Sequence, residues 1–279
     1  MSNYEEYLEL KRKNIPYERE RLKRWFYAGA INFINSSQYT SFYLTNINKV
    51  IEYPFLTLLL TGSLSSSVLW AYFTDFVRKN KSRIEYTTDY NRNFLHELEK
   101  INFDIKRTNI HKATSVSSFI SSIGSSLYSY FLITNMSLDL FLSIYVIPGF
   151  FYSLLDSGFW VYNYLKCNPE IKKFKEKGKN INIKNFFNVV FEEYKEHNYL
   201  SMMYKRTKRW IFRFFLNLIS SLASAMYGSY LVLFNSAIFE NTLLYLFFIP
   251  SIVSSIIFSL FWYKNLKWFI SDLKRFKNT

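Results

Sequence analysis

The chain has 279 residues, of which 35 are Lys or Arg and 21 are Asp or Glu, and its formal charge is +14 at pH 7. The basic residues stand between long apolar runs instead of gathering on one soluble surface, which excludes a basic nucleic-acid-binding protein. The single cysteine, Cys167, excludes an internal disulfide framework and a multi-cysteine metal site.

Residues 1–25 form a charged, amphipathic opening, whose polar and acidic start is neither a secretory signal nor an Arg-rich transit peptide. Residues 26–46 are predicted to cross a membrane only because they match a later segment. The amides of Asn32, Asn35 and Gln38 are costly in lipid and must then face other helices.

Five further segments are apolar and close to the roughly 20 residues that a helix needs to cross a bilayer. They are residues 54–77, 113–136, 140–165, 211–234 and 243–263. The sequence therefore predicts an all-α integral membrane protein with six transmembrane helices.

Long basic loops are expected at 78–112 and 166–209, each with an amphipathic helix shortly before the next span. The short connections on the other side hold only Lys49 as a basic residue. By the positive-inside rule, the basic side and both termini face a bacterial cytosol or a mitochondrial matrix.

Several positions recur at constant spacing, which indicates an internal repeat. The pairs 99 residues apart are Ser121 and Ser220, Ser125 and Ser224, and Ser129 and Gly228. The pairs 102 residues apart are Pro148 and Pro250, Ser157 and Ser259, and Trp160 and Trp262. Ser67 and Trp70 precede Ser157 and Trp160 by 90 residues, and Lys23, Arg24 and Trp25 precede Lys208, Arg209 and Trp210 by 185. We therefore expect one membrane domain, residues 1–279, made of the two-helix repeats 1–80, 81–167 and 168–279.

This organisation resembles the mitochondrial carrier family. The resemblance is sharpest over residues 190–230, where an acidic amphipathic stretch leads through Tyr204, Arg206 and Arg209 into a helix that ends in small residues at Tyr227 and Gly228. It implies a pseudo-three-fold bundle in the mitochondrial inner membrane, with short amphipathic helices and both termini on the matrix side. The family's Pro-x-Asp/Glu-x-x-Lys/Arg signature is missing, and Asp156 alone survives at its expected positions.

Because the carrier signature is lost while the helical scaffold persists, we expect a non-enzymatic accessory or structural subunit of a large inner-membrane complex of respiratory type. Its partners would be other subunits and membrane lipids, cardiolipin among them, without nucleic acid or cofactor. The alternative is a functional solute carrier that exchanges an anionic metabolite. No phosphate loop, nucleophile elbow or paired-carboxylate motif supports an enzyme.

Small residues four apart predict close helix packing in lipid, with a polar pathway wall as the alternative function. These positions are Ser121, Ser125, Ser129, Ser220, Ser224 and Gly228. A second set of cations beside indoles predicts interfacial anchors or a binding site for anionic lipid headgroups. This set is Lys23, Arg24, Trp25, Lys208, Arg209 and Trp210.

Three ionisable residues stand in or at the ends of the apolar segments. Asp156 is expected to serve a pathway or a buried pair, because a charge inside a membrane needs a partner or water. Asp75 and Arg213 are expected to reach toward the basic membrane surface. His96, His111 and His197 have no ligand-spaced neighbours and predict no metal site.

Overall fold

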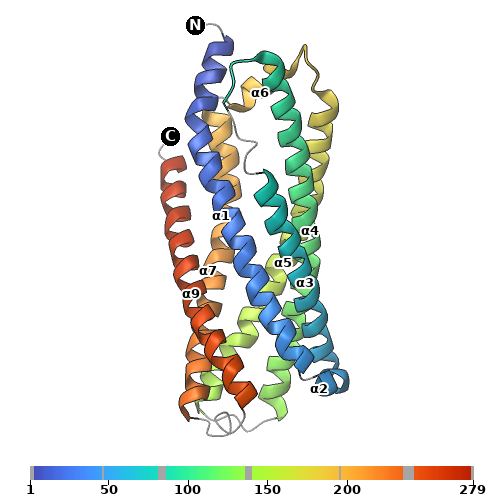
Figure 1. Cartoon of the computed structure of the whole chain (residues 1–279), viewed down its shortest axis with the longest axis vertical. Coiled ribbons are helices and arrows are strands. Elements are labelled where there is room, and N and C mark those ends of the chain that lie inside the picture. The colour runs from blue at the N-terminus through green and yellow to red at the C-terminus, as the bar shows by residue number, and fades with distance from the viewer. Residues whose placement is uncertain are drawn as a thin grey trace.

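The computed structural model describes residues 3–45, 47–80, 86–135, 140–194, 196–234 and 242–277, and within these ranges the regular structure is entirely helical. The helices are α1 (Asn3–Thr45), α2 (Ile47–Glu52), α3 (Pro54–Asn80), α4 (Tyr90–Asn135), α5 (Leu140–Asn180), α6 (Phe186–Tyr194), α7 (Glu196–Phe234) and α9 (Thr242–Lys277). Figure 1 shows the long helices running side by side, with α6 at the end where both termini lie.

Within the described ranges, three stretches are long and apolar enough to cross a bilayer: Pro54–Asn80, Tyr90–Asn135 and Ser143–Asn180. A shorter apolar stretch, Trp210–Met226, lies within α7. The prediction of an all-α chain with membrane-compatible helices is therefore confirmed at this level.

The predicted basic loops are largely helical, which corrects the sequence interpretation. Helix α4 begins at Tyr90 and α5 continues to Asn180. The amphipathic stretches near residues 4–7 and 94–100 are not separate surface helices but parts of α1 and α4. No proline interrupts α4 where its sequence changes from charged to apolar, so that change marks a new environment along one continuous helix.

The helices pack most extensively in the pairs α1–α3, α4–α5 and α7–α9, and α3 also packs along α4. Contacts of α5 with α7, and of α1 with α9, are sparse but complete a ring in chain order. The division of the chain into three repeats remains a prediction.

Glycine allows the closest of these helix approaches. A Cβ atom added to Gly62 of α3 would lie 2.6 Å from the backbone nitrogen of Ser121 in α4, so only hydrogen fits there. Helices α3 and α4 therefore meet backbone to backbone, as small residues permit in lipid.

Two hydrophobic cores hold the long helices along their length. One contains Leu22, Trp70, Phe73, Phe76, Val77, Ile110, Phe159 and Trp160. The other lies at the end near α6 and contains Tyr7, Ile101, Ile181, Phe186, Val190 and Phe191. The second core ties α1, α4, α6 and the segment that follows α5 together, beyond the apolar part of the bundle.

Candidate functional site

A cavity of about 700 Å³ lies within the helix ring and is lined by residues of α1, α3, α4, α5, α7 and α9. Hydroxyl groups, amides and aromatic rings form most of its wall. Burying polar groups between helices costs free energy unless water or other side chains satisfy their hydrogen bonds. A cavity with this lining is therefore a candidate binding site and not an apolar void left by imperfect packing.

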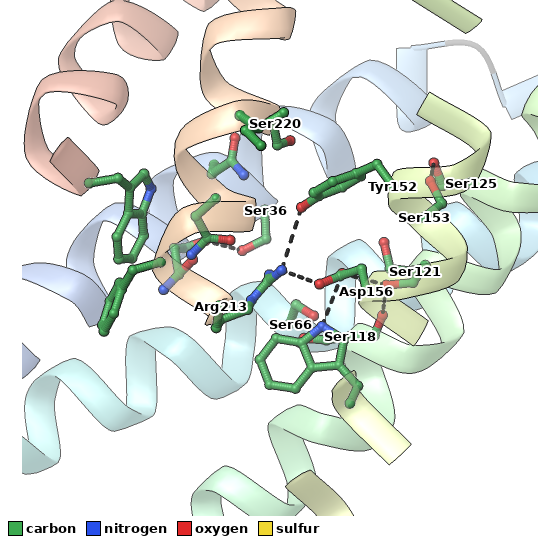
Figure 2. A pocket seen from close by; sticks show the side chains of 18 of the residues that line it. Ser36, Ser66, Ser118, Ser121, Ser125, Tyr152, Ser153, Asp156, Arg213 and Ser220 are labelled. Carbon is green, nitrogen blue, oxygen red and sulfur yellow. Dashed lines mark hydrogen bonds and ion pairs between the residues drawn. The ribbon is translucent and has the colours of Figure 1, made fainter. Parts of the chain in front are cut away.

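A buried ion pair crosses the cavity between α7 and α5. The Arg213 guanidinium binds Oδ1 of Asp156 and donates to the Tyr152 hydroxyl at 3.4 Å (Figure 2). The other carboxylate oxygen accepts from Ser122 Oγ at 2.7 Å and from Trp160 Nε1 at 3.1 Å. Three further side chains, those of Tyr152, Ser122 and Trp160, thus complete the hydrogen bonding of the ion pair.

The surroundings of this pair strengthen it. The side chains of Arg213 and Asp156 are only 13% and 9% exposed. The Arg213 guanidinium carbon also lies 4.8 Å from the Trp160 ring centroid, within cation–π range. The sequence suggested that Arg213 reaches toward the membrane surface. It does not, because the carboxylate of Asp156, 57 residues earlier in the chain, lies within its reach inside the bundle.

Asp75, in contrast, lies at the partly exposed end of α3. Its carboxylate pairs with Arg78 at 2.7 Å and with Lys79 at 2.6 Å, all on one helix. These contacts within α3 are an exposed ion pair with which the buried Arg213–Asp156 pair can be compared.

The small residues predicted to pack helices also line the cavity. The side chains of Ser121, Ser125, Ser129, Ser220 and Ser224 all belong to its wall. Ser121 meets Gly62 directly, and Ser125 accepts a hydrogen bond from Ser153 at 2.9 Å. The same serines therefore contact neighbouring helices and line the cavity, while a role as a pathway wall stays a prediction. The environment of Gly228 lies outside the described side chains.

The two basic–aromatic triplets are not brought together as a surface site. Lys23 and Lys208 are exposed, whereas the rings of Trp25 and Trp210 line the cavity. Arg24 pairs with Glu20 at 3.2 Å, and its guanidinium carbon lies 3.7 Å from the Trp268 ring centroid.

The side chain of Arg209 lies outside the described part of the structure. Headgroup binding by Lys23, Arg24, Trp25, Lys208, Arg209 and Trp210 remains a prediction.

Sequence reasoning missed how the tryptophans gather. All six tryptophans of the chain line the cavity: Trp25, Trp70, Trp160, Trp210, Trp262 and Trp268. Two cations sit on one of them, because the guanidinium carbons of Arg21 and Arg107 lie 4.7 and 4.8 Å from the Trp25 ring centroid. The available signal was the constant spacing of Trp70, Trp160 and Trp262.

Positions aligned by that spacing share one environment. Ser67, Ser157 and Ser259 are all buried, and each hydroxyl donates to the carbonyl four residues earlier at 2.8–2.9 Å. The ion pair breaks this regularity, because the positions aligned with Asp156 are Ser66 and Phe258. At these aligned positions, a carboxylate is therefore present only at Asp156.

Beyond the apolar segments, Lys11 of α1 is buried against α4. Its Nζ donates to Asn93 Oδ1 at 2.6 Å. Burial lowers the pKa of the Lys11 ammonium below its ordinary value, and the nearby Glu97 carboxylate partly opposes that shift.

Among the residues that the structure describes, no three His, Cys, Asp or Glu side chains come together in a group that could hold a metal ion. The polar groups that face the cavity include the Arg213–Asp156 pair, hydroxyls and amides. Comparison with protein-family models, with curated proteins and with solved structures finds no match for this chain.

Proposed function

We propose that the chain is a six-span membrane protein that binds a small anionic solute in its central cavity and exchanges it across the mitochondrial inner membrane. The observation that carries this proposal is the buried Arg213–Asp156 pair inside a cavity of about 700 Å³. Burying an ion pair costs more than packing apolar residues of similar volume, so a helix bundle needs no such pair for stability alone. Ionisable residues at membrane depth mark substrate pathways by default.

Cations outnumber carboxylates among the side chains that line the cavity. The wall contains the guanidiniums of Arg21, Arg107 and Arg213 and the carboxylates of Asp156 and Glu170. Arg21 pairs with Glu18 at 2.7 Å and Arg107 with Asp104 at 3.0 Å, so an anion would compete with carboxylates for these cations as it does at Arg213. The formal charge of +14 adds a long-range attraction for anions. An incoming carboxylate or phosphate can replace Asp156 at the planar guanidinium, which presents two parallel donors to either group.

The volume and lining suit a small metabolite. Pockets for small molecules commonly enclose about 300–1,000 Å³ and combine apolar walls with a few placed polar groups. Here the six indoles supply the apolar wall, and hydroxyls from α3, α4, α5 and α7 supply the polar groups. The carrier-like six-span arrangement and the basic, matrix-facing end are parts of the same proposal.

The second candidate function is an accessory subunit of a large inner-membrane complex. The observation in its favour is that Arg213 and Asp156 already neutralise each other, as a purely structural pair would. The missing carrier signature points the same way. Partner subunits and anionic lipid would then cover the outer helix faces.

Reconstitution into liposomes separates the two. The purified chain is tested for saturable exchange of phosphate, a dicarboxylate and a nucleotide, beside Arg213→Gln and the matched control Arg78→Gln. We expect exchange by the parent chain and by the control, whose cation is on the exposed pair with Asp75, and none by Arg213→Gln. No exchange of any anion, together with migration as part of a large assembly on native gels, would favour the subunit.

A further inference from the structure

Four of the long helices form one closely packed block. Helices α1, α3, α4 and α5 are joined by extensive contacts between successive neighbours. Gly62 and Ser121 meet backbone to backbone, Ser66 and Ser117 lie 3.0 Å apart between hydroxyls, and Asn163 donates to Ser115 at 2.8 Å. We refer to these four helices as the block.

Helices α7 and α9 pack on each other as a second unit, the hairpin. The ring of Phe214 lies 5.1 Å from that of Trp262 and 4.6 Å from that of Phe269, centroid to centroid. Figure 1 shows the two helices together on one side of the molecule, beside α1. Their mutual contacts are far more extensive than those with the block.

Among the described residues, the hairpin meets the block mainly along two seams, α5/α7 and α1/α9, where the backbones approach at few places. One ring contact also joins α7 to α4, between Trp210 and His111, whose ring centroids lie 5.5 Å apart. The first seam is spanned by the Arg213–Asp156 pair (Figure 2). It is also spanned by the Phe159 and Trp210 rings, whose centroids lie 5.8 Å apart. The tips of long side chains, not backbones, hold this seam.

The second seam is built in the same way. The Gln38 amide and the Ser254 hydroxyl exchange hydrogen bonds at 3.1 Å, and the Tyr17 and Trp268 rings stack at 5.8 Å. Polar contacts of this type break and reform at small cost when water can replace them.

The short helix α6 restrains one end of the hairpin. It packs on α1 and on α7, and its Phe186 and Phe187 rings contact Phe94 and Tyr7 of the block. Motion of the hairpin is therefore smallest at the α6 end and largest at the opposite end.

We infer that the α7–α9 hairpin moves as a unit against the block, with the α6 end as pivot, and that the Arg213–Asp156 and Gln38–Ser254 contacts are the two latches that hold it closed. The coupling of this motion to solute rests on the proposed function: an anion that takes Arg213 from Asp156 releases the α5/α7 latch. A ligand shifts the equilibrium between the closed and open positions of the hairpin only if it binds one position more tightly than the other. Arg213 provides this difference, because it is paired with Asp156 only in the closed position.

Spin-label distances test the motion without reference to transport. In a Cys167→Ser background, Tyr72→Cys on α3 is paired with Tyr263→Cys on α9 across the seams, or with Tyr162→Cys on α5 within the block. All three tyrosines are 48–56% exposed, and none lines the cavity. We expect a broad or two-peaked distance distribution for the first pair and one narrow peak for the second. Equal narrow distributions would overturn the inference, whether or not the chain transports.

Cross-linking tests the link to exchange. Gln38→Cys with Ser254→Cys joins α1 to α9, and the control Tyr72→Cys with Lys106→Cys joins α3 to α4, where the ammonium lies 5.7 Å from the ring centroid on the surface. Both are treated with the same short, reducible thiol cross-linker. Exchange should fall at least about tenfold in the seam variant, return on reduction, and change less than about twofold in the control.

Unchanged exchange through a fully cross-linked seam would refute the latch. An equal loss in both variants would also refute it, because the block would then have to move as well. If the parent chain exchanges no anion, the proposed function fails while the spin-label result still decides the motion.

Discussion

Separating the buried Arg213–Asp156 pair should cost a large part of the stability of the bundle. At about 4 Å and an effective dielectric constant of about 20, two unit charges attract by about 4 kcal/mol. Removing one partner of a buried pair costs about 3–5 kcal/mol, because the other charge stays in place without compensation. Since the cavity can admit water, we expect Asp156→Ala and Arg213→Ala each to lower the free energy of unfolding by about 3 kcal/mol.

The double variant should be less damaged than the two single losses together predict. It leaves neither charge behind, so the coupling free energy of the cycle should be about 2–3 kcal/mol. Tryptophan fluorescence during thermal unfolding in mild detergent measures it, with shifts of about 6–12 °C for each single variant. The same cycle on Asp75 and Arg78 is the control, and we expect its losses to add, because that pair is exposed.

Simple additivity at Asp156 and Arg213 would refute the reasoning. It would mean that each charge is solvated by itself and that the geometry of the pair contributes nothing. A double variant more stable than the parent would instead support a functional origin, since the pair would then be kept at a cost to the fold.

Three further outcomes are expected. Gly62→Ala should force α3 and α4 apart and destabilise by about 1–3 kcal/mol in thermal unfolding, whereas Gly158→Ala, with nothing within 4 Å of its added methyl, should be neutral or slightly stabilising. Cys167 is buried and lines the cavity, so it should react faster with small thiosulfonates than with bulky ones, and a transported anion should slow both reactions. Mass spectrometry measures the extent of labelling. Equal rates for small and bulky reagents, without protection by the anion, would argue against a continuous cavity. Because burial lowers the folded-state pKa of Lys11, the unfolded chain binds more protons between that pKa and the ordinary value of about 10.4, so stability should rise with pH through this window. Lys11→Met should flatten that rise in denaturation at several pH values, and an unchanged slope would locate the titration elsewhere.

The apolar runs were sufficient to predict helices, because length and hydropathy are local properties of the chain. The helix ends were predicted poorly. The charged residues after Tyr90 were expected to form a loop with a separate amphipathic helix. Apolar residues recur among them at helical spacing and no proline interrupts them, so α4 continues through this stretch as one helix. A change from apolar to charged residues reports where a membrane would end, not where a helix ends.

The candidate site was predicted only in part. Asp156 stood out because a carboxylate inside an apolar segment needs a partner. Its partner could not be identified, since Arg213 lies on a helix brought close by the ring closure alone. Trp25 and Trp210 looked like surface anchors because an indole beside a cation is common at membrane interfaces; only the rotation of their helices turns both rings inward.

The length of the helices gives the molecule a marked asymmetry about the bilayer. With 46 residues at about 1.5 Å each, α4 is about 69 Å long, more than twice the roughly 30 Å of the hydrocarbon layer. In a bilayer placed on its apolar half, the other half stands clear of the lipid, and the core around Phe186 and Val190 lies in that projecting part. Under the proposed membrane placement, the helices form a stalk on one side of the bilayer, and a binder raised against the stalk would report which way the chain is inserted.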